Sequence, residues 1–136
     1  MTTDQEQAER QAEAMYDADL ASQSLGISIS EVGPGRARAT MPVTRAMLNG
    51  HGRCHGGYVF LVADTAFAFA CNTHGAAVVA AGADVSFLAP AGEGDVLVAD
   101  GVERVVRGRS GIYDVTVRSG DVVIAEFRGR SRQLSS

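Results

Sequence analysis

Cysteines, basic clusters and long apolar runs are all scarce in this chain of 136 residues. Its two cysteines cannot form a disulfide framework, so we expect a reducing compartment. The net charge is −4 and no block is strongly basic, which argues against a nucleic-acid partner. The longest apolar run, residues 58–71, is shorter than the ~20 residues that a membrane span needs, and it contains Asp64. We therefore expect no membrane partner.

The composition is that of one soluble globular domain, with 46% apolar and 21% charged residues. The N-terminus is acidic and polar and lacks the basic start and apolar stretch of a signal peptide, so we expect a cytoplasmic protein. Thr3 and Glu6 have capping-box spacing, and Gly26 could end the helix that they begin. Residues 1–14 have almost no apolar face, however. We expect residues 1–14 to fray or to be disordered, and residues 15–136 to form the domain.

The rest of the chain has the pattern of two strands, a buried helix and four further strands. Turn residues separate strands predicted at 27–32 and 36–41. Residues 55–74 predict a long helix that is apolar on nearly every side. Val-rich and Ile-rich segments then predict an antiparallel meander of strands at 77–88, 96–106, 112–118 and 122–133. The pattern predicts an α+β domain, with an antiparallel sheet of five to six strands wrapped around the central helix and a short N-terminal helix.

The stretch NGHGRCHGG before the long helix invites a metal-site interpretation. His51, Cys54 and His55, with Cys71 and His74 further on, loosely resemble a zinc pattern. On a helix, Cys54 and Cys71 would lie about 25 Å apart at ~1.5 Å per residue. A tetrahedral site needs all its ligands around one ion. We therefore expect no metal site within the chain.

Two further interpretations of this stretch are weak. Gly50, Gly52 and Gly56 suggest a dinucleotide-binding loop, but no strand precedes them and no βαβ unit surrounds them. Cys54 near two histidines could be a nucleophile, because a helix N-terminus lowers the pKa of a thiol. No residue that would orient the base is evident, and a half-buried structural thiol is the simpler interpretation.

The glycines at the start of the long helix are stronger candidates. Gly56 and Gly57 have no side chains, so a ligand can approach their backbone. N–H groups in the first turn of a helix have no intrahelical partners, and the helix dipole makes this end positive. Such groups can polarise a carbonyl oxygen that gains negative charge. The alternative is that the glycines only permit close packing.

Asp64 is the most informative residue of the apolar helix. Buried carboxylates are rare unless they are paired, and no lysine or arginine lies between Arg53 and Arg104. Apolar surroundings should raise the pKa of Asp64, as a general base often requires. The alternative is an acid that hydrogen-bonds a loop or a partner chain. Because Gly56 and Asp64 would lie roughly 12 Å apart along one helix, they can act on one carbonyl only from two chains.

These residues resemble the hotdog-fold acyl-CoA thioesterases, and most closely those of the bacterial phenylacetic-acid-degradation type. The resemblance rests on NGHGRCHGG, VADTAF, DVSFLAP, GIYDVTV and FRGRSRQL. It implies a hotdog fold, hydrolysis of acyl-CoA thioesters that are often aromatic, and homodimers commonly paired into homotetramers. It also implies that no metal or organic cofactor is needed.

The resemblance assigns roles to individual residues. It makes Asp64 the catalytic acid and Gly56 the backbone donor to the thioester carbonyl, supplied by the opposite subunit. Asn49 matches an asparagine near the thioester, and His55 matches the histidine before the glycines. We add Gly57 and Thr65 as candidate substrate-binding residues.

The chain departs from the resemblance at one position. Some relatives have a serine or threonine on the strand that faces the acid, where this chain has only alanines and a glycine at 80–83. Thr65 or Asn49 would then have to position the water. Arginines at four positions are candidates for binding the CoA phosphates: Arg107, Arg109, Arg128 and Arg130.

Two other functions stay open at this stage. A hotdog hydratase or dehydratase would act on acyl-CoA or on acyl carrier protein, and a binding module would hold acyl-CoA without cleaving it. The sequence also leaves the acyl group open, as well as the choice between Asp64 as a general base and as a nucleophile.

Overall fold

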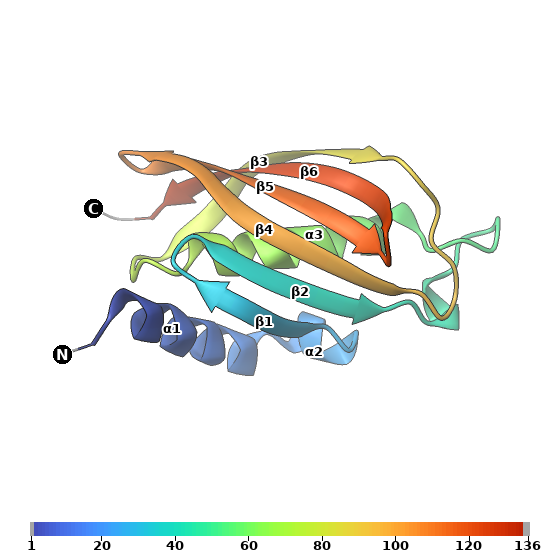
Figure 1. The fold of residues 1–136 in the computed structure, drawn as a ribbon, viewed down its shortest axis with the longest axis horizontal. Helices are drawn as coiled ribbons and strands as arrows, with labels where there is room; N and C mark the ends of the chain where they lie inside the picture. The colour runs from blue at the N-terminus through green and yellow to red at the C-terminus, as the bar shows by residue number, and fades with distance from the viewer. Residues whose placement is uncertain (1, 135–136) are drawn as a thin grey trace.

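The computed structural model describes residues 2–134, which form one sheet, one long helix and an N-terminal helical segment (Figure 1). In chain order the elements are α1 (Asp4–Ala18), α2 (Leu20–Ser24), β1 (Ser28–Gly33), β2 (Arg36–Pro42), the short helix η1 (Arg45–Met47), α3 (Gly56–Cys71), β3 (Val78–Phe87), β4 (Val96–Arg107), β5 (Ser110–Ser119) and β6 (Val122–Gln133). The predicted elements are thus all present, with ends that differ by a few residues.

The six strands form one antiparallel sheet in the order β1-β2-β4-β5-β6-β3. The predicted meander is right for β4, β5 and β6 but wrong for β3, which pairs with β6 at the far edge. The segment between β3 and β4 crosses over, so that β4 joins β2. As a result, β1 and β3 are the two edge strands.

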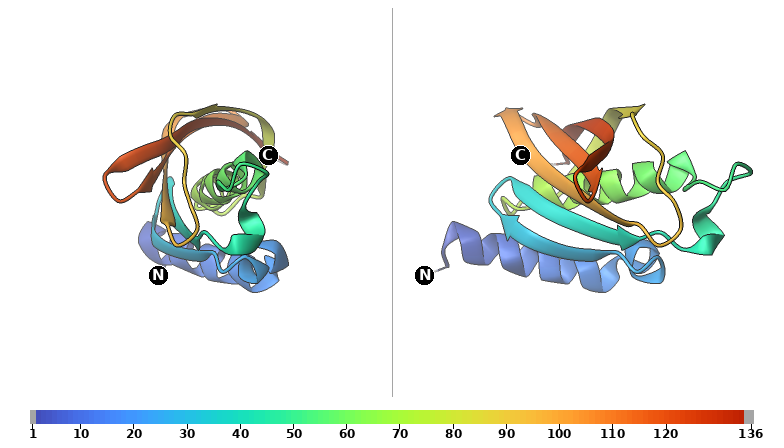
Figure 2. Two further views of the ribbon diagram at one scale, coloured as in Figure 1. Left: turned by 90° about the vertical axis from the view of Figure 1, so that its right-hand side faces the viewer. Right: turned by 45° about the vertical axis from the view of Figure 1, so that its right-hand side comes forward.

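The sheet curves around α3, as Figure 2 shows in the view along the helix. Alternate residues of the strands face the helix, and this inner face supplies most of the core. Phe67 of α3 lies against the rings of Tyr113 and Phe127. Gly129 accepts the ring of Phe67 because it has no side chain: a methyl group there would lie 2.7 Å from the ring.

Both ends of α3 are set by side chains. His55 caps its start, where the ring Nδ1 accepts a hydrogen bond from the Gly57 N–H. The helix ends at Cys71 rather than at residue 74, because Asn72 turns the chain toward β3. Its amide donates to the Ala68 and Val78 carbonyls and accepts from the Val78 N–H.

The N-terminal segment forms helix α1 from Asp4 onward, within the part of the chain where we expect fraying or disorder. Thr3 and Glu6 form a capping box, as their spacing predicts. The helix has only a narrow apolar face, but alanine suffices there: Ala8 and Ala12 are buried beside the edge strand β1. The small side chains allow close approach to β1, so this segment packs without large apolar residues. Met1 lies outside the described residues.

Candidate active site

The loop before α3 is held by Asn49. Its Oδ1 accepts hydrogen bonds from the N–H groups of His51 (2.9 Å) and Arg53 (3.2 Å), and its own N–H donates to the Arg53 carbonyl. Cys54 then donates its N–H to the Ala91 carbonyl, which fixes the loop to the body of the domain. The side-chain NH2 of Asn49 has no partner among residues 2–134, so it is available as a donor to a ligand.

The structure separates the roles of the two glycines. The Gly57 N–H donates to the His55 ring at 2.9 Å and is therefore occupied. The Gly56 N–H makes no hydrogen bond with the rest of the described chain. Gly56 is thus the free donor at the positive end of α3, and His55 serves as the cap that positions it.

A depression of about 450 Å³ opens beside Gly56 and includes Asn49, Cys54 and Phe87 among its lining residues. Phe87 ends β3, and its ring lies against Gly56. Sequence reasoning did not single out Phe87. The position of Phe87 could have been found from the two-residue period of side chains along β3. This period places Phe87 on the same inner face as Val85 and Ala83.

Asp64 lies in the middle of α3 and is half-buried. Its carboxylate forms neither a hydrogen bond nor an ion pair with any of residues 2–134. Burial raises its pKa above the ordinary value of an aspartate. An unpaired carboxyl with a raised pKa is a candidate general base or nucleophile.

Two other candidate residues have structural contacts. Thr65 is 8% exposed, and its hydroxyl donates to the Leu61 carbonyl at 2.8 Å, one turn back in the same helix. That hydrogen bond leaves no donor for a water near Asp64. Cys54 is buried, and its pKa is raised by burial and by Asp95, the opposite of what a thiolate nucleophile needs. Cys71 is also buried, with a pKa raised to about 12.

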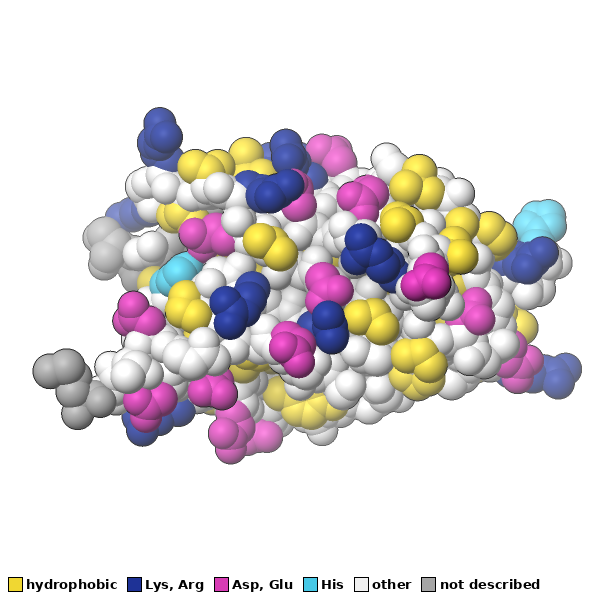
Figure 3. Space-filling model, viewed as in Figure 1, with side chains coloured by type: hydrophobic (Ala, Val, Ile, Leu, Met, Phe, Trp, Pro, Cys, Tyr) yellow, Lys and Arg dark blue, Asp and Glu magenta, His cyan; other side chains and the backbone are white. Residues whose placement is uncertain are grey.

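The structure divides the four candidate arginines into two groups. Arg128 and Arg130 have carboxylate partners, Asp114 at 2.7 Å and Asp84 at 2.8 Å. Arg107 and Arg109 form no ion pair with the described part of the chain. Arg109 lines a cavity at the C-terminal end of α3, away from Gly56. Figure 3 shows acidic and basic side chains interspersed over the outer face of the sheet.

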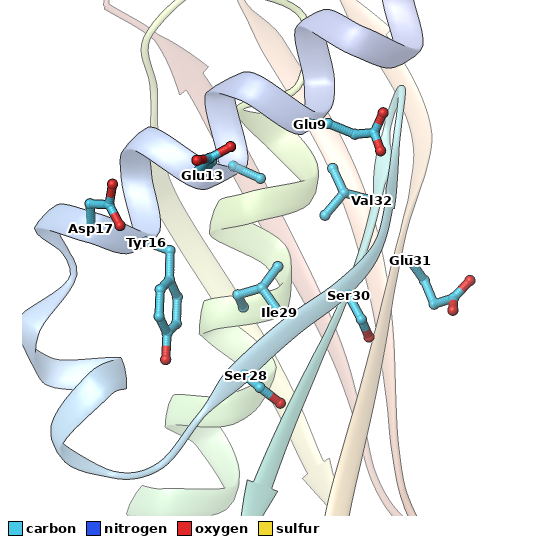
Figure 4. A pocket seen from close by; sticks show the side chains of 10 residues that line it. Glu9, Glu13, Tyr16, Asp17, Ser28, Ile29, Ser30, Glu31 and Val32 are labelled. Carbon is cyan, nitrogen blue, oxygen red and sulfur yellow. The ribbon is translucent and has the colours of Figure 1, made fainter.

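A second groove, of about 450 Å³, lies between α1 and β1 (Figure 4). Its lining comes from these two elements alone and includes none of the predicted site residues. Four acidic residues are among those that line it: Glu9, Glu13, Asp17 and Glu31. They would repel the phosphates of CoA, so we do not place the substrate there.

Within residues 2–134, no group of three or more histidine, cysteine, aspartate or glutamate side chains is placed to hold a metal ion. No helix in the same range is long and apolar enough to cross a membrane.

Comparisons with known proteins identify the family of this fold. The family model of the thioesterase superfamily matches residues 51–126. The chain is 44% identical to the acyl-coenzyme A thioesterase PaaI of Escherichia coli (strain K12) over 124 residues, which cover 90% of this chain and 89% of that protein. The solved structure of the E. coli PaaI protein from the phenylacetic acid degradation operon has a TM-score of 0.96 and 41% identity, with 98% of each chain covered. The TT0310 protein of Thermus thermophilus has a TM-score of 0.81 and 34% identity over 84% of this chain and 97% of that one. The chain therefore belongs to the thioesterase superfamily and has its hotdog fold.

Proposed function

We propose that this protein hydrolyses acyl-CoA thioesters to a free acid and CoA. The observation that carries the proposal is Asp64, an unpaired, half-buried carboxyl with a raised pKa. It occurs in a chain that is 44% identical to an acyl-CoA thioesterase. The free N–H of Gly56 supplies the second requirement, a donor for the carbonyl oxygen.

In this reaction the thioester carbonyl oxygen accepts hydrogen bonds from the Gly56 N–H and the Asn49 amide. Asp64 then acts in one of two ways. As a base, it takes a proton from water as the water oxygen bonds to the carbonyl carbon. As a nucleophile, it forms an anhydride that water cleaves. In both paths the C–S bond breaks, the sulfur leaves as thiolate, and CoA ends with one proton.

The proposed reaction requires two chains. Gly56 and Asp64 are eight residues apart on one helix, roughly 12 Å along its axis, so one carbonyl cannot touch both within a chain. We propose a homodimer in which α3 of one subunit lies antiparallel to α3 of the other. Each Asp64 then faces the partner's Gly56.

The exposed surface of the monomer fits such a dimer. Strand β3 is a ten-residue edge strand with little cover, and Val79, Phe87 and the adjoining Leu88 are exposed. A long, apolar, unpaired edge commonly pairs with another chain. The adjacent face of α3, with Leu61, Asp64 and Ala68, is also only partly covered. Pairing of two dimers into a homotetramer stays a prediction.

The relatives favour an aromatic acyl group. The E. coli structure, at 41% identity, is that of a protein from the phenylacetic acid degradation operon. We therefore propose phenylacetyl-CoA as the first substrate to test. Both cysteines are free, which agrees with the cytoplasmic location that we propose.

The activity is tested by thiol release from acyl-CoA. Asp64→Asn should lower kcat by at least about a hundredfold. Asp121→Asn, in an exposed turn, is the matched control and should retain normal turnover. Near-normal turnover of Asp64→Asn would overturn the proposal. Product analysis with an enoyl-CoA tests for a hydratase, and binding without thiol release would indicate a binding module.

Subunit complementation tests the two-chain site. Asp64→Asn homodimers should be nearly inactive, and Gly56→Ala homodimers should retain less than about one tenth of wild-type activity. A heterodimer of the two variants has one intact site, made of Gly56 from one chain and Asp64 from the other. A one-to-one mixture with random exchange should recover about one quarter of wild-type activity. No recovery, despite exchange confirmed by mass spectrometry, would contradict the shared site.

A further inference from the structure

A cavity of about 300 Å³ lies at the C-terminal end of α3, away from Gly56. Cys71, Ala76, Val78 and Tyr113 line it, together with the charged Arg109. Tyr113 is buried. The hydroxyl of Tyr113 donates to Glu103 Oε1 at 3.0 Å, which holds this wall of the cavity in place.

His74 fixes the mouth of the cavity. Its Nε2 lies 2.7 Å from the same oxygen of Glu103, which joins the end of α3 to β4. The cavity thus has a fixed polar rim and a largely apolar interior.

Ser131 is an unexplained group in this cavity. The residue is 5% exposed, yet its hydroxyl has no hydrogen-bond partner among residues 2–134. Every side-chain nitrogen or oxygen that is fully enclosed in this range has a partner, so the Ser131 oxygen must reach the cavity surface. It occupies space that only a glycine at position 111 leaves open, because a methyl group there would lie 2.6 Å away. A nearly buried hydroxyl without a protein partner favours a binding role for the cavity.

The cavity lies on the Asp64 side of α3. Cys71 follows Asp64 by seven residues, which places both on one helix face about 10 Å apart along the axis. The Asp64 charge also contributes to the raised pKa of Cys71. Gly56 lies in the opposite direction along the helix.

Small side chains lie on α3 and β3 between the level of Asp64 and the cavity. Ala68 lies between Asp64 and Cys71 on the outer stripe of α3. On β3, Ala80 pairs with Ser131 and Ala83 pairs with Gly129, so both alanines share the inner face with residues at the cavity. No large side chain of β3 projects inward between these two positions.

We propose that this cavity receives the far end of the acyl group, so that Val78, Ala76 and Ser131 determine which acyl lengths are accepted. This inference rests on the proposed thioesterase function. With the carbonyl carbon at Asp64 and CoA leaving toward solvent, the acyl group runs along α3 toward Cys71. The cavity is roughly twice the size of a 150 Å³ cavity that holds benzene, so it can take a ring or an alkyl end.

The preferred acyl groups are therefore those whose end lies about 10 Å beyond the carbonyl carbon. Octanoyl-CoA and 4-phenylbutyryl-CoA should have values of kcat/KM at least about tenfold above that of acetyl-CoA. Phenylacetyl-CoA, whose ring stops short of the cavity, should fall between them.

Two pairs of variants test the cavity. Ala76→Phe fills it, and its control is Ala77→Phe at the adjacent exposed position, which does not line the cavity. Val78→Ala enlarges it, and its control is Val122→Ala, an exposed valine at the start of β6 that does not line the cavity. We expect Ala76→Phe to lower kcat/KM for octanoyl-CoA about tenfold or more and to leave acetyl-CoA within about twofold. Val78→Ala should shift the optimum to longer chains, and both controls should match wild type.

The outcomes separate this inference from the proposed function. If wild type cleaves acyl-CoA but neither cavity variant changes the length profile, the inference is wrong and the proposed function stands. If wild type releases no CoA from any substrate, both are overturned. Circular dichroism confirms that each variant is folded, and Val78→Ala keeps the test valid if Ala76→Phe does not fold.

Discussion

The ring of Phe87 lies against the first residue of α3: a methyl group on Gly56 would be 3.2 Å from the Cζ of Phe87. Glycine therefore serves two purposes at this position. It leaves the N–H open to a ligand, and it allows the end of β3 to close over the start of the helix.

Gly56→Ala should push the Phe87 ring outward and narrow the approach to the N–H. We expect kcat/KM to fall by more than about tenfold, while the melting temperature stays within a few degrees because alanine is a good helix residue. The double variant Gly56→Ala/Phe87→Ala should recover part of the loss. Equal activity of the single and double variants would show that Phe87 is not the obstacle.

Replacement of Asp64 should increase stability at neutral pH. Its raised pKa means that the folded state disfavours the ionised form. The stability associated with the protonated carboxyl is present below the unfolded pKa, about 3.9, and is lost as the pH rises through the folded value. Asp64→Asn should therefore unfold at a higher urea concentration than wild type at pH 8.

The extra stability of Asp64→Asn over wild type should disappear below about pH 3.9, where the Asp64 side chain of wild type is also neutral. Urea titrations at several pH values measure it, with Asp121→Asn as the surface control. A constant difference at all pH values would assign the effect to something other than ionisation.

Thr65→Val should have little effect on catalysis. The hydroxyl donates to the Leu61 carbonyl, and valine keeps the shape of the side chain. We expect a stability loss of about 1 kcal/mol and kcat/KM within about threefold of wild type. Steady-state kinetics with phenylacetyl-CoA decide the matter. A hundredfold loss of kcat with unchanged KM would instead establish Thr65 as a residue that positions water.

The Asp114 carboxylate should stabilise the folded state at neutral pH, and this contribution should be lost in acid. Arg128, and to a smaller extent Arg104, lower its pKa to about 2. Stability from this carboxylate is present above the unfolded pKa and is lost as the pH falls from about 3.9 through about 2. Because the pair is exposed, we expect Asp114→Asn to cost only about 1 kcal/mol at pH 7.

The same variant should match wild type near pH 2, and half a molar salt should reduce the difference at pH 7. Chemical denaturation at both pH values provides the measurement. An undiminished difference at pH 2 would show that packing, not charge, explains the loss.

The helices and strands could be predicted from the sequence because each one follows from a local pattern of residues. The run around Asp64 is too long and too apolar for a strand, and Gly33–Gly35 can only turn. The position of β3 was not accessible. Strand β3 pairs with β6 because of the path of the segment that follows it. No residue within β3 specifies that path.

Part of the candidate site stands out in the sequence for the same reason. Gly56 and Asp64 stand out by residue type within their surroundings. By contrast, the exclusion of Gly57 depends on one ring nitrogen of His55, and the contact of Phe87 depends on how β3 runs back along α3. These are relations between distant or alternative partners, and they are visible only in three dimensions.

The placement of Gly56 and Asp64 on one helix has a consequence for regulation by abundance. A lone folded chain would carry both halves of the machinery and be unable to bring them to the same substrate. At concentrations below the dimer dissociation constant, the specific activity would decline in step with dilution, although every molecule remained folded. The amount of protein in the cell would then set not only how much thioesterase is present but also what fraction of it works.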